Sequence, residues 1–83
     1  MRLRAEGLSA RELSGEIILL DLRSSRYLSV SGVGVDIVNL LSVDRTEEEL
    51  IAAVLEQYEV DEATVRRDAL TFLGQLRDAG LLE

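Results

Sequence analysis

The first half of the chain alternates between short apolar runs and polar turns, a pattern typical of β-strands. Residues 8–13 alternate weakly, and the Ser14-Gly15 dipeptide that follows can adopt the positive backbone angles of a tight hairpin turn. Residues 17–20 are a continuous run of Ile and Leu, which predicts the central strand of a small sheet with both faces at least partly covered. After a turn at residues 23–25, residues 26–30 alternate again. The pattern therefore predicts a three-stranded antiparallel meander.

The third predicted strand, residues 26–30, has an outer edge that no other segment of the sequence obviously covers. Unpaired backbone N–H and C=O groups at such an edge pair with any extended chain that arrives, so the edge is either an aggregation hazard or a binding site. We interpret it as a binding site. Alternation places Arg26, Leu28 and Val30 on one face and Tyr27 and Ser29 on the other. Tyr27 has two equal alternatives, a place in the core or contact with a bound peptide.

The hydrophobic period changes from two to 3.6 after residue 30, which predicts three helices. Ser31 is the expected N-cap of the first helix, although two glycines weaken its first turn. Thr46 and Glu49 have the spacing of a capping box at the start of the second helix. Asp61 is expected to cap the third helix, which ends at Gly80.

Each predicted helix has an apolar stripe. The first stripe contains Val33, Ile37, Leu40 and Leu41, the second contains Leu50, Ile51, Val54, Leu55 and Tyr58, and the third contains Val65, Ala69, Phe72, Leu73 and Leu76. The pattern breaks at Glu59-Val60, between the second and third helices, and residues 81–82 are expected to fold back on the core. Residues 1–7 show no sustained period, which predicts a loosely held arm or a short leading strand.

The third helix carries a second line of side chains beside its apolar stripe. Arg66, Leu70, Leu73 and Arg77 lie at i, i+4, i+7 and i+11, so two apolar residues are flanked by two guanidinium groups. Two interpretations remain open. The line is either the margin of a wide core stripe with solvated flanks or one wall of a groove.

Strands followed by helices predict an α+β domain in which the helices cover one apolar face of the sheet. A chain of 83 residues encloses only one core, so residues 1–83 are expected to form a single domain. No apolar run approaches the roughly 20 residues of a membrane helix, and the N-terminal residues do not lead into a signal-peptide core. We therefore expect a cytoplasmic protein with no membrane partner.

The residue types exclude much chemistry. The chain has no Cys, His or Lys, which excludes a thiol nucleophile, an imidazole base, a zinc-finger spacing and a Schiff base. The remaining candidate pairs, Glu16 with Asp21 and Asp36 with Asp44, occur at strand ends, helix starts or turns, where solvated surface charge explains them. We expect no catalytic residue, no metal site and no cofactor.

The net charge of −7 arises entirely from residues 46–83, which contain three Arg and ten acidic residues. Such a field repels nucleic acid and argues against a DNA-binding domain. The acidic helices either keep the protein in solution or attract a basic partner protein. An acidic carrier protein would need a serine at a helix start for its prosthetic arm, and the Ser-Gly-Val context of Ser31 does not match.

Three segments in this order resemble the PqqD-like family, the RiPP recognition elements that bind leader peptides of ribosomally made, post-translationally modified peptides. They are ELSGEIILLDLRSSRYLSVSGVG, TEEELIAAVLEQYEVD and the pattern D-x-x-x-F-L-x-x-L-x-x-x-G-L-L, and together they run from about Glu12 to Leu82. The resemblance implies a winged-helix-like fold. The family often has Asn-Pro-Thr-Gly before its first helix, where this chain has Ser-Gly-Val-Gly, so the resemblance leaves the subfamily open.

The resemblance also implies a mode of binding, in which the leader peptide adds a strand to the third strand and packs on the third helix. Carried over to this chain, Arg26, Tyr27, Leu28, Ser29 and Val30 supply backbone pairing. The side chains implied to receive or flank apolar anchors of the leader are Arg66, Leu70, Leu73 and Arg77.

The free-standing member most similar in size is the leader-binding protein of split lasso-peptide systems, which works beside a separate leader peptidase. Two alternatives remain. One is a peptide chaperone that serves a radical maturation enzyme in quinone-cofactor biosynthesis, and the other is a protein-protein adaptor that acts through the acidic helices.

Overall fold

Three strands precede three helices along the chain, as the hydrophobic pattern predicts. The structure, a computed structural model, describes residues 1–58 and 61–83, so the predicted break at Glu59-Val60 lies outside the described residues. The elements are β1 (Leu8–Leu13), β2 (Glu16–Asp21), β3 (Arg26–Val30), α1 (Val33–Leu40), α2 (Glu47–Gln57) and α3 (Glu62–Asp78). The predicted α+β class, a three-stranded antiparallel sheet followed by three helices, is confirmed.

The sheet is an antiparallel meander with the strand order β1-β2-β3. Ser14 and Gly15 both have positive φ angles, 53° and 81°, and directly join the paired residues Leu13 and Glu16. Two central residues with positive φ give a hairpin turn whose twist matches that of the strands. The predicted turn at this dipeptide is therefore confirmed.

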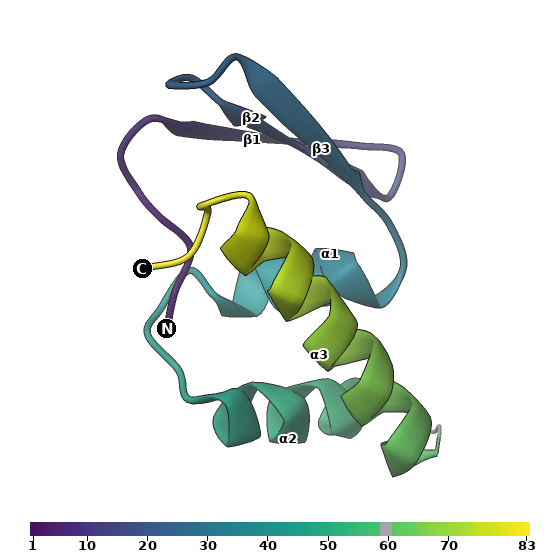
Figure 1. The fold of residues 1–83 in the computed structure, drawn as a ribbon. Helices are drawn as coiled ribbons and strands as arrows, with labels where there is room; N and C mark the ends of the chain where they lie inside the picture. Colours follow the sequence, from purple (N-terminus) through teal and green to yellow (C-terminus); the bar gives the residue numbers. More distant parts are fainter. Residues whose placement is uncertain (59–60) are drawn as a thin grey trace.

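All three helices lie on one side of the sheet (Figure 1). Ile17 and Leu19 of β2 point to that side and are buried, whereas Ile18 is half-buried and Leu20 is exposed on the other side. The prediction that both faces of the central strand are at least partly covered is confirmed for the inner face, whereas on the outer face only Ile18 of β2 is partly buried. Successive strand residues alternate between faces, and within the described residues no element packs on the outer face.

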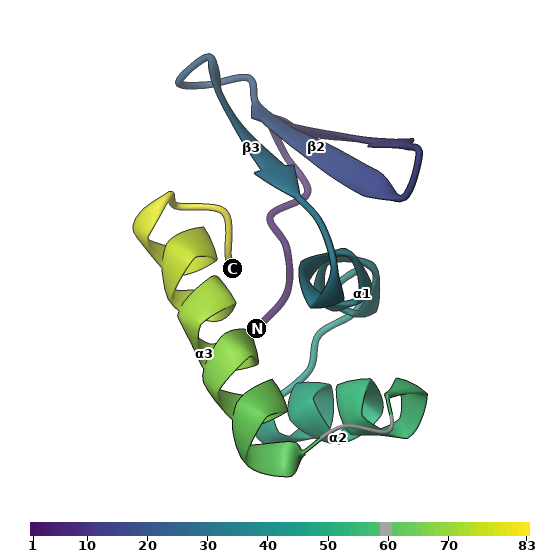
Figure 2. The same ribbon diagram turned by 90° about the vertical axis from the view of Figure 1, so that its right-hand side faces the viewer.

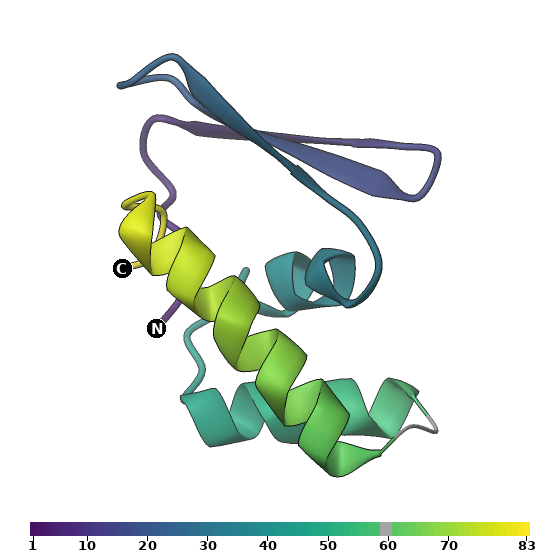
Figure 3. The same cartoon turned by 45° about the vertical axis from the view of Figure 1, so that its right-hand side comes forward.

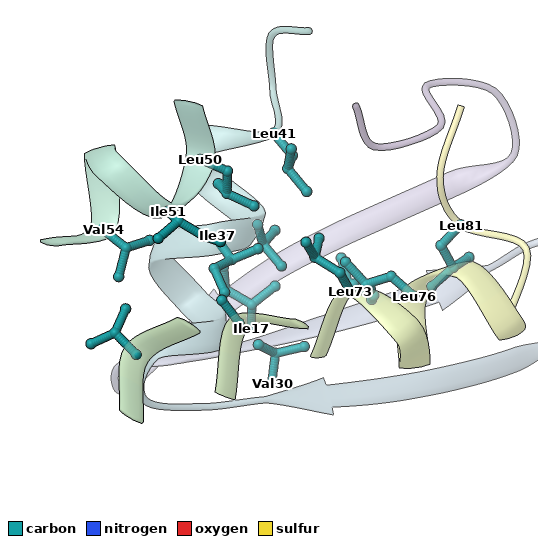
Figure 4. Close-up of a cluster of buried hydrophobic side chains, with 14 residues drawn as sticks. Ile17, Val30, Ile37, Leu41, Leu50, Ile51, Val54, Leu73, Leu76 and Leu81 are labelled. Atoms are coloured by element: carbon teal, nitrogen blue, oxygen red, sulfur yellow. The ribbon is translucent and has the colours of Figure 1, made fainter. Parts of the chain in front are cut away.

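The core lies between the inner face of the sheet and the three helices (Figure 4). Its buried side chains come from β2, β3, the three helices and the residues just after α1 and α3; they are Ile17, Leu19, Val30, Ile37, Val38, Leu41, Leu50, Ile51, Val54, Val65, Ala69, Leu73, Leu76 and Leu81. Leu55, Tyr58 and Phe72 pack against this cluster while remaining partly exposed. The predicted helical stripes therefore form one continuous core.

The helix starts agree with the sequence prediction at two of three positions. Thr46 Oγ1 accepts a bond from the Glu49 amide at 3.1 Å while Glu49 Oε1 accepts one from the Thr46 amide at 2.8 Å, which completes the capping box. Asp61 caps α3 as expected. The N-cap of α1 is Gly32 and not Ser31, because the chain turns into the helix at Gly32 with φ at 60°, a conformation that favours glycine.

Residues 1–4 are held by hydrogen bonds to distant parts of the chain, so the predicted loosely held arm is wrong. Leu3 forms an isolated antiparallel bridge with Leu82, and its amide donates to the Leu41 carbonyl at 3.0 Å. The Arg4 amide donates to the Leu81 carbonyl at 2.8 Å. The alternative of a short leading strand is nearer to the structure, although the arm pairs with the C-terminal segment and not with the sheet.

Within residues 1–58 and 61–83, no helix has both the length and the apolar character needed to cross a membrane.

Candidate functional site

The outer edge of β3 is the first component of the candidate site. In the described part of the chain β3 pairs with β2 alone, so its other edge presents unpaired backbone groups. Figure 2 shows β3 at the margin of the sheet nearest α3. An open strand edge beside a helix can accept an extended peptide through backbone hydrogen bonds.

Two hollows follow the gap between β3 and α3, and together we call them the β3–α3 cleft. The wide hollow has a volume of about 430 Å³ and lies at the start of β3 and the end of α3. It is lined by Leu19, Asp21, Ser24, Arg26, Tyr27, Leu28, Asp78, Ala79 and Leu81. Leu19 and Leu81 are buried, so the wide hollow combines an apolar floor with charged side chains of both signs.

The narrow hollow has a volume of about 240 Å³ and lies at the other end of β3. It is lined by Ser29, Val30, Ser31, Val33, Gly34, Phe72 and Gln75. The cleft thus has, at each end of the open strand, a hollow that can receive a side chain of a bound peptide. Such an arrangement is expected of a surface that recognises alternate side chains of an added strand.

The structure places all five predicted residues of β3 beside the cleft. Arg26, Tyr27 and Leu28 line the wide hollow, and Ser29 and Val30 line the narrow hollow. Tyr27 is 74% exposed, so the alternative that placed it in the core is wrong. Strand alternation explains this, because Tyr27 pairs with the exposed Leu20, whereas Leu28 pairs with the buried Leu19.

The predicted residues of α3 lie elsewhere. Leu73 is 1% exposed and belongs to the core. Arg66 donates two hydrogen bonds to the carboxylate of Glu48 in α2, at 2.7 and 3.3 Å, and therefore points towards α2. Leu70 is 40% exposed and, like Arg77, does not line either hollow.

The cleft wall of α3 is formed instead by Phe72, Gln75, Asp78 and Ala79. At 3.6 residues per turn, a step of two residues rotates the side chain by roughly 200°, so the line through Phe72 and Gln75 lies almost opposite the line through Arg66 and Leu70. Figure 3 shows α3 running from α2 towards the sheet, with its first turns beside α2 and its last turns near the sheet. Both flanks border the same core stripe, and the sequence prediction took the flank that faces away from β3.

Two residues in the sequence, Phe72 and Gly34, could have indicated which flank of α3 lines the cleft. An added Cβ on Gly34 would lie 2.7 Å from Val30 Cγ1 and 3.4 Å from Phe72 Cζ. Gly34 is therefore needed for a close approach between α1, the end of β3 and the ring of Phe72. In the sequence, this glycine indicates only a weakened first turn of the first helix.

Asp21 is the most strongly bonded charge at the wide hollow. Its pKa is held below the ordinary value of 3.8 mainly by the amide of Arg23; partial burial opposes this effect, and the guanidinium group of Arg4 and the hydroxyl of Ser24 add to it. Arg4 Nη2 lies 2.6 Å from Asp21 Oδ1. The carboxylate therefore stays charged at neutral pH and fixes the turn between β2 and β3.

No group of three or more acidic side chains in the described ranges is arranged to hold a metal ion. The cleft contains hydroxyl, amide, carboxylate and guanidinium groups beside an apolar floor, and such a set can bind a peptide by backbone pairing and side chain burial.

Comparisons with known proteins agree with this geometry. The family model described as coenzyme PQQ synthesis protein D (PqqD) matches residues 16–82. A solved structure of TbiB1 in complex with the TbiA(beta) leader peptide is 32% identical, with a TM-score of 0.85 over 100% of this chain and 95% of that chain. A structure of lasso peptide synthetase B1 complexed with the leader peptide is 24% identical and has the same fold, with a TM-score of 0.80 over 99% of this chain and 95% of that one. No curated protein matches the chain.

Proposed function

This chain belongs to the PqqD family, and on that premise we propose that it binds the leader segment of a ribosomally made precursor peptide in lasso-peptide biosynthesis. The family match covers most of the chain, and the similar TbiB1 structure holds a leader peptide. The observation that carries the proposal is the open edge of β3 beside a cleft with a hollow at each end.

In the proposed complex the leader forms a fourth strand next to β3. Backbone hydrogen bonds along the strand accept many sequences, so specificity comes from the leader side chains that enter the two hollows. Leu28 offers apolar surface from the sheet, and Phe72 offers it from α3. Asp78 and Arg26 face the wide hollow without an ion pair in the described residues, so either charge can meet a charged side chain of the leader.

The protein itself is not a catalyst in this proposal. It delivers the leader to a separate leader peptidase or other maturation enzyme in the cytoplasm. Holding the precursor beside that enzyme raises the local substrate concentration and increases effective affinity by roughly 10² to 10⁴ without a catalytic group on this chain.

A second candidate function follows from the description of the matching family. A PqqD-type chaperone would bind the peptide precursor of the quinone cofactor and present it to a radical maturation enzyme. The same strand edge serves both functions, so the identity of the bound peptide distinguishes them.

The test is a titration of the protein into fluorescently labelled peptides, followed by anisotropy. The probes are the leader of the precursor encoded next to this chain, the TbiA(beta) leader, the quinone-cofactor precursor and a scrambled leader. We expect saturable binding of the neighbouring leader and none of the scrambled peptide. Tighter binding of the quinone-cofactor precursor would support the second candidate function instead. If the folded protein binds none of these peptides, both candidate functions are contradicted.

Single N-methylation of each leader amide then tests the mode of binding. An added strand donates hydrogen bonds to its neighbour from alternate residues, so methylation should weaken binding with a period of two. A uniform response along the leader would contradict strand addition.

A further inference from the structure

The guanidinium group of Arg4 joins two parts of the chain that are far apart in sequence. Arg4 Nη1 donates to the Gly80 carbonyl at 2.8 Å, and Arg4 Nη2 donates to Asp21 Oδ1 at 2.6 Å. The Arg4 and Asp21 side chains are 13% and 12% exposed, so the ion pair is largely shielded from water. Charge-assisted hydrogen bonds in such surroundings hold a defined geometry.

The two acceptors of Arg4 belong to opposite walls of the wide hollow. Asp21 lines the hollow and pairs across the sheet with Arg26, the first residue of the open strand. Gly80 directly follows Ala79, which lines the hollow from the C-terminal end of α3. One planar group therefore connects the strand wall to the helix wall.

The hydrogen bonds of Arg4 link the two walls indirectly, through the N-terminal arm. In the described part of the chain no hydrogen bond joins β3 to α3. The backbone of the N-terminal arm supports the connection, because the Arg4 amide donates to the Leu81 carbonyl and the Leu22 amide donates to the Gly7 carbonyl, each at 2.8 Å. The arm thus holds both walls from behind the cleft.

We propose that Arg4 is a positioning residue that sets the separation between the strand and helix walls of the wide hollow, and so determines how tightly the leader side chain in that hollow is bound. This inference rests on the proposed function. Preorganised walls bind a side chain without the cost of ordering the site during association. The arm at residues 1–7 thereby takes part in peptide selection although it lines no part of the wide hollow.

Arginine is the residue type that this geometry requires. Its planar fork presents several N–H donors in fixed directions, whereas the lysine ammonium group is a compact charge on a flexible chain. Arg4→Lys therefore keeps a positive charge near Asp21 but loses the fixed link to the Gly80 carbonyl. Arg4→Gln removes the charge as well.

Arg2 provides a matched control on the same arm. Its guanidinium group pairs with Glu83 at 2.9 Å, and these side chains are 53% and 44% exposed. Arg2 lines neither hollow of the cleft. Arg2→Lys and Arg2→Gln therefore repeat the chemical change at a site that does not hold the two walls.

The experiment is a double-mutant cycle between Arg4 and the leader. Contacts from leader side chains to Leu28 and Ala79, measured by nuclear Overhauser effects, identify the leader residue in the wide hollow, and contacts to Phe72 identify the one in the narrow hollow. Each of these two leader residues is replaced by alanine in a separate peptide. The affinities of the intact leader and of the two alanine leaders are then measured for the wild-type protein and for the Arg4 and Arg2 variants.

We expect Arg4→Lys to weaken binding of the intact leader by about tenfold, with a smaller change for Arg2→Lys. The Arg4 effect should disappear for the leader that lacks the wide-hollow side chain and persist for the leader that lacks the narrow-hollow one. A general loss of protein structure would instead weaken the binding of all three leaders by the same factor.

Equal affinity of folded Arg4→Lys and wild type overturns the inference, as does an effect that is the same for all three leaders. Unfolding of both Arg4 variants also overturns it, because Arg4 would then act in stability alone. Failure of the wild type to bind any leader would instead contradict the proposed function on which the inference rests.

Discussion

Arg66 of α3 forms a two-pronged ion pair with Glu48 of α2, with N–O distances of 2.7 and 3.3 Å. The pair holds the pKa of Glu48 below its ordinary value of 4.5, chiefly through the hydrogen bonds from Arg66. The Arg66 flank of α3 is therefore turned towards α2, whereas the residues of α3 that line the β3–α3 cleft lie on the opposite flank. The buried stripe of α3, Val65, Ala69, Leu73 and Leu76, holds the helix in this orientation.

We predict that Arg66→Gln leaves leader affinity within about twofold of wild type, because an exposed pair on the far flank contributes little to the cleft. The same substitution should raise the pKa of Glu48 towards 4.5, which a carboxyl-carbon NMR titration measures. Leu70→Ser, on the same flank, should also preserve affinity. A large loss of affinity in either variant would show that the Arg66 flank of α3 is part of the binding surface.

The wide hollow should be sensitive to its size. Ala79 lines this hollow, and its exposed position at the C-cap of α3 can accept a larger side chain. Ala79→Phe should fill part of the hollow and weaken leader binding by about tenfold or more. The matched control is Ala63→Phe, which adds the same ring at an exposed position in the first turn of α3 and should have no effect. Equal affinities of the two variants would show that the leader does not enter the wide hollow.

The narrow end of the cleft depends on the small size of Gly34. A Cβ there would lie 2.7 Å from Cγ1 of the buried Val30, so Gly34→Ala should lower the free energy of unfolding by about 1 to 3 kcal/mol through overpacking. Gly74→Ala is the control, since no atom lies within 4 Å of its added Cβ. That change should raise the free energy of unfolding by about 0.5 to 1 kcal/mol through helix propensity. Urea unfolding that gives both changes the same sign would contradict the close approach.

The start of α2 should make stability depend on acid. The Thr46 amide and then the Thr46 hydroxyl hold the pKa of Glu49 below 4.5 in the folded protein. A lowered folded pKa means that the charged cap stabilises the protein above pH 4.5, and that this contribution is lost as the pH falls through the lowered value. Wild type should therefore be more stable than Glu49→Gln near neutral pH, and the difference should shrink on acidification. A difference that grows on acidification, in urea unfolding followed by circular dichroism, would contradict the capping role.

Much of this fold could be predicted from the sequence because its signals are local. The Ser14-Gly15 turn, the capping box at Thr46 and the N-cap at Asp61 each depend on residues within one turn of the chain. The strand edge could also be predicted, because a meander leaves its last strand at the margin of the sheet. Local chemistry therefore sufficed for the elements and for the position of the open β3 edge.

The α3 half could not be predicted in the same way. Leu70 and Phe72 both flank the core stripe, and which of them meets β3 depends on how α3 packs on the shared core. The hydrogen bonds of Arg4 were equally hidden, because its partners Asp21 and Gly80 lie far along the chain. Contacts between distant residues depend on the three-dimensional path of the chain and leave no periodic signal.

The most direct test of leader binding at the β3–α3 cleft is a map of backbone amide chemical shifts in the labelled protein during titration with the neighbouring leader. We predict that the largest changes occur at residues 26–30 and at residues 72–79, with small changes at Glu48 and Arg66. The new backbone bonds should also protect amides of β3 from hydrogen exchange. Changes concentrated on α2 and the Arg66 flank, with β3 unaffected, would contradict strand addition and favour an adaptor that acts through the acidic helices.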